Sequence, residues 1–278
     1  MLTKLISRYD TIGHQILDLE AELGVSTEPH KETLDMLIKE ARTAIQVKDT
    51  YTREDAVGIL GTINSMLQNN GFEQRDREKH IDGLYLFYEG LSSKRIDCDN
   101  TSFIYLSIAD ALRLPLAAVN APQHLFVRFI LNGEGINWET TSARERGNNY
   151  YKSWLNISDK AISKGVYLRN LTRQETMAFV YNNRGVAWAN KGNLDNAIAD
   201  YNEAIRLDPN NADAYYNRGI AWGRKGNLDN AIADYNEVIR LNPNFADAYY
   251  NRGIIKLKKL NLIGAGADFA RAMLPIFR

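Results

Sequence analysis

Two adjacent segments of this chain have nearly the same sequence. Residues 178–211 and 212–245 are identical at 25 of 34 positions, and a third copy runs from Ala246 to Arg278. A period of 34 residues is typical of a helix–turn–helix unit, which buries its apolar face only by stacking on neighbouring units. The sequence therefore predicts an all-α stacked array over residues 172–278.

The repeated residues resemble the tetratricopeptide repeat (TPR). Three glycines recur where the two helices of such a unit approach closely, with small residues opposite them: Gly185, Gly219 and Gly253, then Ala197, Ala231 and Ala265. A capping-box sequence at residues 172–175 predicts that the first repeat helix begins there. We expect one tyrosine of each repeat, at positions 181, 215 and 249, to lie in the core. The resemblance implies three repeats (178–211, 212–245 and 246–278) and a groove for a protein or peptide partner.

The same resemblance implies which side chains face that groove. They lie on the first helix of each repeat and include Asn183, Asn217, Asn251, Tyr216, Tyr250, Arg224 and Lys258. Asparagine amides both donate and accept hydrogen bonds, so they can hold a peptide backbone without reading its sequence. The third copy supplies its second helix but no polar capping helix. We therefore expect an uncapped apolar face, which would favour a homo-oligomer or packing on the rest of the chain.

The charge balance argues against several partner classes. The chain has 34 basic and 34 acidic residues, so no overall field attracts nucleic acid or anionic lipid. No stretch is long and apolar enough to span a membrane, and the N-terminal residues lack the core of a signal peptide. The single cysteine excludes an internal disulfide, and the histidines lack metal-ligand spacing. We expect a cytoplasmic protein with no cofactor, no metal, no nucleic-acid partner and no membrane partner.

Residues 1–171 have a different pattern and form the other predicted domain. Helical periodicity covers two segments within residues 1–50, and residues 53–68 after a capping box at Thr52. A further helical segment begins after Cys98 and ends at Leu112. Short strands are then predicted at 116–120, 124–131 and 136–141, with an Asn-Gly hairpin signal at residue 132. Residues 142–153 are polar and predict a loop. The fold class is therefore α+β, a helical and antiparallel-sheet domain followed by an all-α solenoid.

The order of three residue types in this domain indicates nucleophilic chemistry. Cys98 opens a helix, His124 opens a strand and Glu139 lies on the next strand. A thiol nucleophile needs a base within hydrogen-bond reach, and that base needs an orienting acceptor. A helix start favours a thiolate through the helix dipole. Asn137 shares a strand face with Glu139, so either residue could orient His124.

Residues 91–141 resemble the core of the transglutaminase-like cysteine hydrolase superfamily. The similarity covers Cys98 with the helix 102–112, the segments 114–116 and 120–124, and Asn-Trp-Glu-Thr-Thr at 137–141. The helical segment before them resembles a bacterial branch that often accompanies TPRs. The resemblance implies a papain-like α+β fold and a catalytic set carried over as Cys98, His124 and Glu139. It also implies an amide-bond enzyme, which could be a hydrolase, a deamidase or an acyltransferase.

A non-catalytic adaptor is the alternative interpretation. A lone cysteine is often a small buried hydrophobic residue. Asp97 and Asp99 flank the thiol, and nearby carboxylates raise the pKa of a thiol and so oppose its activation. In that case the repeats would bind a partner while the N-terminal domain does no chemistry.

Overall fold

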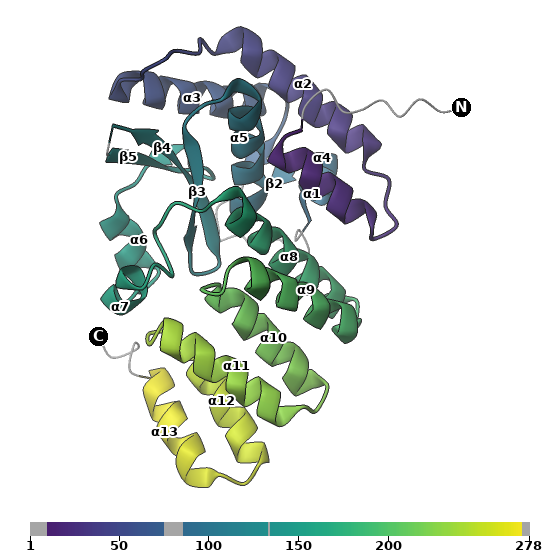
Figure 1. Cartoon of the computed structure of the whole chain (residues 1–278), viewed down its shortest axis with the longest axis vertical. Coiled ribbons are helices and arrows are strands. Elements are labelled where there is room, and N and C mark those ends of the chain that lie inside the picture. The colour runs from purple at the N-terminus through teal and green to yellow at the C-terminus, as the bar shows by residue number, and fades with distance from the viewer. Residues whose placement is uncertain (1–9, 75–85, 133, 274–278) are drawn as a thin grey trace. The chain divides into compact units, whose positions relative to one another are not determined.

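The structure is a computed structural model that describes residues 10–74, 86–132 and 134–273. These residues form two compact units, which Figure 1 colours along the chain. The first unit contains the chain up to Asn120 together with His124–Asn148 and Asn170–Arg173. The second contains Ala121–Gln123, Asn149–Arg169 and the chain from Gln174 onward.

The first unit is built from helices around one small sheet. Its described helices are α1 (Ile12–Ala21), α2 (Glu28–Ala44), α3 (Arg53–Asn69), α4 (Phe87–Ser93) and α5 (Cys98–Leu112). The capping box predicted at Thr52 is confirmed, because Thr52 and Asp55 each accept a hydrogen bond from the other's backbone N–H. The apolar pattern of residues 81–92 also predicts a short helix. Residues 81–85 lie outside the described residues, and α4 begins at Phe87.

The sheet follows the predicted strand pattern. Its four strands are β3 (Leu116–Ala121), β4 (His124–Leu131), β5 (Glu134–Glu139) and β6 (Arg144–Glu145), in that order. A separate parallel pair joins β1 (Glu73–Gln74) to β2 (Arg95–Ile96). Strands β4 and β5 are antiparallel, with Leu131 opposite Glu134 and Val127 opposite Trp138. The prediction of a loop at 142–153 is wrong, because β6 pairs with β5 and a helix begins at Asn148.

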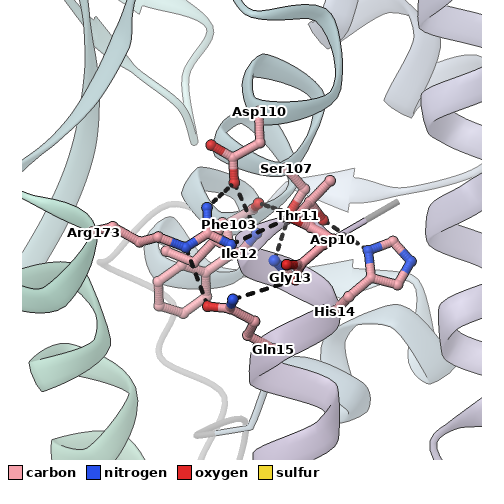
Figure 2. Close-up of polar contacts among 10 residues, drawn as sticks. All are labelled: Asp10, Thr11, Ile12, Gly13, His14, Gln15, Phe103, Ser107, Asp110 and Arg173. Carbon is pink, nitrogen blue, oxygen red and sulfur yellow. Dashed lines mark hydrogen bonds and ion pairs between the residues drawn. The ribbon is translucent and has the colours of Figure 1, made fainter. Parts of the chain in front are cut away.

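Helix α5 is held in place by its contacts with α1 (Figure 2). The backbone N–H of Ile12 donates to Asp110 at 2.8 Å, and that of Gly13 donates to Ser107 at 3.0 Å. Both acceptors lie on α5, so this helix caps the N-terminus of α1. Arg173 donates to the same Asp110 carboxylate at 2.7 Å. The helix that begins with Cys98 is thereby fixed at its far end.

The second unit contains the predicted helix pairs. Its helices are α6 (Asn148–Trp154), α7 (Asp159–Ser163), α8 (Arg173–Asn190), α9 (Leu194–Leu207), α10 (Ala212–Arg224), α11 (Leu228–Leu241), α12 (Ala246–Lys258) and α13 (Leu262–Met273). Pairs α8–α9, α10–α11 and α12–α13 follow one another along the array (Figure 1).

The repeat glycines allow close helix packing, as the sequence predicts. A Cβ atom at Gly185, Gly219 or Gly253 would stand 2.6, 2.8 or 2.7 Å from a ring carbon of Tyr201, Tyr235 or Phe269, respectively. The three alanines of the second helices are buried. The tyrosines at 181, 215 and 249, expected in the core, are half-buried, and Tyr181 and Tyr215 pack against the buried clusters of the repeats. Each also lies under the arginine three residues later, which forms a bidentate pair with an aspartate of the same repeat: Arg184–Asp200, Arg218–Asp234 and Arg252–Asp268.

The segment 149–169 belongs to the same compact unit as the repeats. Arg169 forms ion pairs with Asp208 at 3.1 Å and with Glu175 at 2.8 Å. Ser158 donates to Asn242 at 3.3 Å, and Lys164 donates to the carbonyl of Arg240 at 3.1 Å. These contacts connect the segment to the first turn of α8 and to the residues at the ends of α9 and α11.

Candidate functional site

The start of α5 lies against two strand ends in the first unit. Ser102, one turn after Cys98, donates to the carbonyl of Leu125 at 3.2 Å. The backbone N–H of Leu125 in turn hydrogen bonds to the Cys98 sulfur. Thr140, just after β5, donates to the carbonyl of Cys98 at 3.4 Å. The predicted thiol is therefore next to the residue that follows His124.

His124 and Glu139 form a buried pair. The Nε2 atom of His124 lies 2.7 Å from Oε2 of Glu139, and the side chains are 1% and 5% exposed, respectively. The register explains the contact. Val127 pairs with Trp138, so the next residue, Glu139, lies opposite position 126 and diagonal to His124. With Nε2 bonded to the carboxylate, Nδ1 is the ring atom that would exchange a proton with a substrate or a thiol.

Glu139 is held as a carboxylate. Burial works against its ionisation, but hydrogen bonds from His124 and Thr141 outweigh burial and keep the pKa of Glu139 below its usual value. The Thr141 hydroxyl donates to Oε1 at 2.8 Å, so both oxygens of the carboxylate have a side-chain donor. Thr141 was not predicted as a site residue, although two threonines directly follow Glu139 in the sequence.

Asn137 has other partners. Its side-chain oxygen accepts from Arg128 at 2.6 Å, and its amide donates to Asn148 at 2.8 Å. Arg128 and Asn137 are directly opposite in the β4–β5 register, which explains this pairing. The structure therefore brings Glu139 to His124 and Asn137 to Arg128.

Two carboxylates surround the thiol and oppose its ionisation. Asp97 is the N-cap of α5 and accepts from the backbone N–H of Asn100 at 2.9 Å. The Cys98 thiol donates to Asp99 at 3.5 Å. Burial, then Asp99 and Asp97, raise the pKa of the Cys98 thiol well above its usual value. Burial and Asp99 also raise the pKa of Asp97 to about 7. The same acidic residues stabilise the helix N-terminus, so helix capping and thiol activation conflict here.

The predicted groove residues lie on the first helices of the repeats. Asn217 donates to Asn182 of the preceding repeat at 2.9 Å, and Asn251 donates to the Tyr216 hydroxyl at 2.9 Å. Asn183 is half-buried beside Asn182. The amide donors of Asn217 and Asn251 thus join neighbouring repeats, which the sequence did not predict. Their side-chain oxygens remain the groups that could accept from a peptide backbone.

The other groove residues differ in exposure. Tyr216 packs on Phe245 with 5.0 Å between ring centroids, and burial raises the pKa of its hydroxyl to about 12. Tyr250 is 53% exposed. Arg224 is exposed and donates to the carbonyl of Ala189 at 3.0 Å, while Lys258 is exposed at the end of α12. The predicted groove residues are therefore most accessible in the third repeat.

Neither a metal centre nor a membrane span is found in the part of the chain that the structure describes. Across residues 10–74, 86–132 and 134–273, no three His, Cys, Asp or Glu side chains are grouped so as to bind a metal ion. Within the same ranges no helix has the length and apolar character needed to cross a bilayer.

The repeats match a known family. A model of the TPR repeat matches residues 185–226 and 224–259. The second TPR of Spaghetti (RPAP3), solved with an HSP90 peptide, is 25% identical over 37% of this chain and 94% of that chain, with a TM-score of 0.36. MamA is 28% identical over 36% of this chain and 65% of that chain, with a TM-score of 0.34. The first TPR domain of human RPAP3 is 29% identical over 36% of this chain and 78% of that chain, with a TM-score of 0.35.

A comparison with curated proteins gave no match. The family match is confined to the repeats, and TPRs suggest a role in protein–protein interaction. The family model does not extend to the helices and small sheets of the first unit.

Proposed function

We propose that this chain is a cysteine-dependent amide-bond enzyme whose TPRs recruit a protein partner or substrate. The observation that carries the proposal is the buried 2.7 Å contact between His124 and Glu139, beside a thiol at a helix N-terminus. A carboxylate that holds one ring nitrogen of a histidine fixes the orientation of the other nitrogen. The transglutaminase-like resemblance of residues 91–141 assigns the same three residues.

The proposed reaction uses each group once. The Cys98 sulfur attacks the carbonyl carbon of an amide while His124 accepts the thiol proton. Glu139 stabilises the imidazolium that results. The carbon–nitrogen bond then breaks, His124 returns the proton to the leaving amine, and a thioester remains on Cys98. Water or an amine resolves this thioester, giving hydrolysis, deamidation or acyl transfer.

The raised thiol pKa shapes this mechanism. Burial and the two flanking carboxylates disfavour a resting thiolate. Proton transfer to His124 therefore accompanies attack instead of preceding it, as at a serine nucleophile. The site would be slow toward unactivated amides unless a bound substrate changed the surroundings of Asp99.

The second candidate is a non-catalytic adaptor, and the raised pKa of Cys98 favours it. In this interpretation Cys98 and Asp97 form the start of α5, the His124–Glu139 pair stabilises the sheet, and function resides in the repeats. The TPR match in residues 185–259 agrees with both candidates.

Acyl transfer from an activated ester tests the proposal without a known substrate. The protein is incubated with p-nitrophenyl acetate, and its intact mass is followed over time. Because Cys98 is the single cysteine, an acetyl group that hydroxylamine removes at neutral pH reports a thioester at that residue. The enzyme should form this adduct and His124→Ala should form much less. Equal adduct formation by both proteins would leave the adaptor as the better account.

A further inference from the structure

The third repeat differs from the other two at the turn between its helices. The position of Leu260 in the third repeat corresponds to Gly192 in the first repeat and Gly226 in the second. These glycines have φ values of +82° and +81°, and Leu260 keeps the same left-handed conformation with φ +60°. A side chain at such a position is strained, and nothing buries it, because Leu260 is 84% exposed. Strain that secures no internal packing points to an external role.

Three more apolar side chains surround Leu260. Leu257, Leu262 and Ile263 are 45%, 64% and 90% exposed. We name these three residues and Leu260 the apolar tip. The turn has a defined backbone, since the N–H of Leu260 bonds to the carbonyl of Leu257 at 2.9 Å and the N–H of Gly264 to the Asn261 side chain at 2.9 Å. The tip thus holds protruding aliphatic groups on an ordered turn.

Ile263 replaces an ion-pair acceptor. In the first two repeats this position is Asp195 or Asp229, and each forms an ion pair with a lysine of the following repeat, Lys225 or Lys259. A further repeat stacked on α13 would bring its lysine against Ile263. Head-to-tail stacking of a second copy would therefore lose the contact that joins the repeats within the array.

An exposed lysine, Lys258, borders the apolar tip. The neighbouring cations are held in ion pairs, Arg252 and Lys256 with Asp268 and Lys259 with Asp229. A two-fold contact between tips would place the Lys258 ammonium groups of two copies near each other, which costs free energy. Lysine is also depleted in protein–protein interfaces. Protruding aliphatic groups beside an exposed lysine instead match a surface that is apolar inside and anionic outside.

We propose that the apolar tip inserts into the surface of an anionic lipid bilayer, with Lys258 at the headgroups. Aliphatic side chains at such a surface reach the boundary between headgroups and acyl chains, and nearby lysines add electrostatic attraction. The zero net charge of the chain led us to expect no membrane partner. That expectation averages over the whole sequence and overlooks the exposed Lys258 beside one apolar turn. The proposal does not depend on the chemistry of Cys98.

Vesicle co-sedimentation of the full chain tests this proposal. Vesicles contain equal parts of phosphatidylglycerol and phosphatidylcholine, with pure phosphatidylcholine for comparison. The double variant Leu260→Gly/Ile263→Asp restores the residues of the first two repeats, so the repeat keeps a sequence that folds in this array. It should weaken binding to the anionic vesicles at least about tenfold. Lys258→Glu should weaken binding to anionic vesicles about fivefold or more and hardly affect the neutral ones.

Val47→Asp is the matched control, because Val47 is an exposed aliphatic residue in the first unit, at 51%. It should bind anionic vesicles like the unaltered protein. Absence of binding by the unaltered protein, or equal binding by the double variant, would overturn the proposal. Two other results would also overturn it: a dimer in sedimentation velocity that the double variant dissociates, without vesicle binding, or retention on an immobilised Leu/Glu amphipathic peptide, without vesicle binding.

Discussion

Glu139 accepts hydrogen bonds on both carboxylate oxygens, from His124 at 2.7 Å on one and from the Thr141 hydroxyl at 2.8 Å on the other. The histidine is therefore oriented by a group that is itself fixed. Thr141→Val removes the second donor and should destabilise the protein by about 1–2 kcal/mol, because the acceptor is a buried charge. Urea unfolding measures this loss. Thr141→Ser keeps the hydroxyl and should recover most of it, and an equal loss in both variants would contradict the account.

Asp97 should make stability depend on pH. Burial and Asp99 raise the pKa of Asp97 in the folded state to about 7, above the usual value of 3.8. The folded state then binds this proton more tightly than the unfolded state, so the contribution of Asp97 to stability is lost as pH rises from the lower value through about 7.

Asp97→Asn keeps an N-cap and cannot ionise. Its unfolding free energy relative to the unaltered protein should increase as pH is raised across that interval. Chemical denaturation at a series of pH values provides the comparison. A difference that stays constant with pH would show that Asp97 titrates in the same way in the folded and unfolded states.

Asp99 should restrain the reactivity of Cys98. Its carboxylate accepts from the thiol at 3.5 Å and contributes to the raised thiol pKa, after burial. Asp99→Asn should therefore speed alkylation of Cys98 by iodoacetamide near neutral pH, by about threefold to tenfold. Asp110→Asn, at the other end of α5, serves as a control and should leave the rate unchanged. A slower rate in Asp99→Asn would indicate that the carboxylate assists the thiol.

Alanine substitutions at Gly219 and Gly266 distinguish the effect of helix packing on stability from that of helix propensity. A methyl group at Gly219 would meet the Tyr235 ring at 2.8 Å, whereas nothing lies within 4 Å of a Cβ at Gly266. Gly219→Ala should destabilise the repeats by about 1–3 kcal/mol, because the core has no room for it. Gly266→Ala should stabilise them by about 0.5–1 kcal/mol, because α13 loses a flexible residue. Circular dichroism during urea unfolding measures both, and equal effects would contradict the packing described.

Local patterns predicted much of the secondary structure. The strand at 124–131 and the capping box at Thr52 follow from alternation and from side-chain chemistry, both of which are local. The choice between Glu139 and Asn137 could not be made this way, because strand alternation gives both the same face. The β4–β5 register, a tertiary property, pairs Asn137 with Arg128 and leaves Glu139 to His124.

Tertiary contacts also explain what the sequence did not predict. Residues 149–169 pack with the repeats through scattered contacts such as Arg169–Asp208, which carry no periodic signal. The tyrosines at 181, 215 and 249 have the residue type of a core position, yet each is covered by an arginine and remains partly exposed. The left-handed Leu260 contradicts the glycine preference that the first two repeats follow.

In the proposed reaction His124 takes the proton of Cys98, and the alkylation rate of this single cysteine tests that step most directly. Intact-mass measurement with iodoacetamide near neutral pH gives the rate for the unaltered protein, His124→Ala, Glu139→Gln and Asn137→Ala, each checked for native circular dichroism. The account predicts the largest loss for His124→Ala, at least about tenfold, since the base is removed. It predicts a smaller loss for Glu139→Gln and little change for Asn137→Ala. Equal rates in the unaltered protein and His124→Ala, both set by a raised thiol pKa, would contradict it.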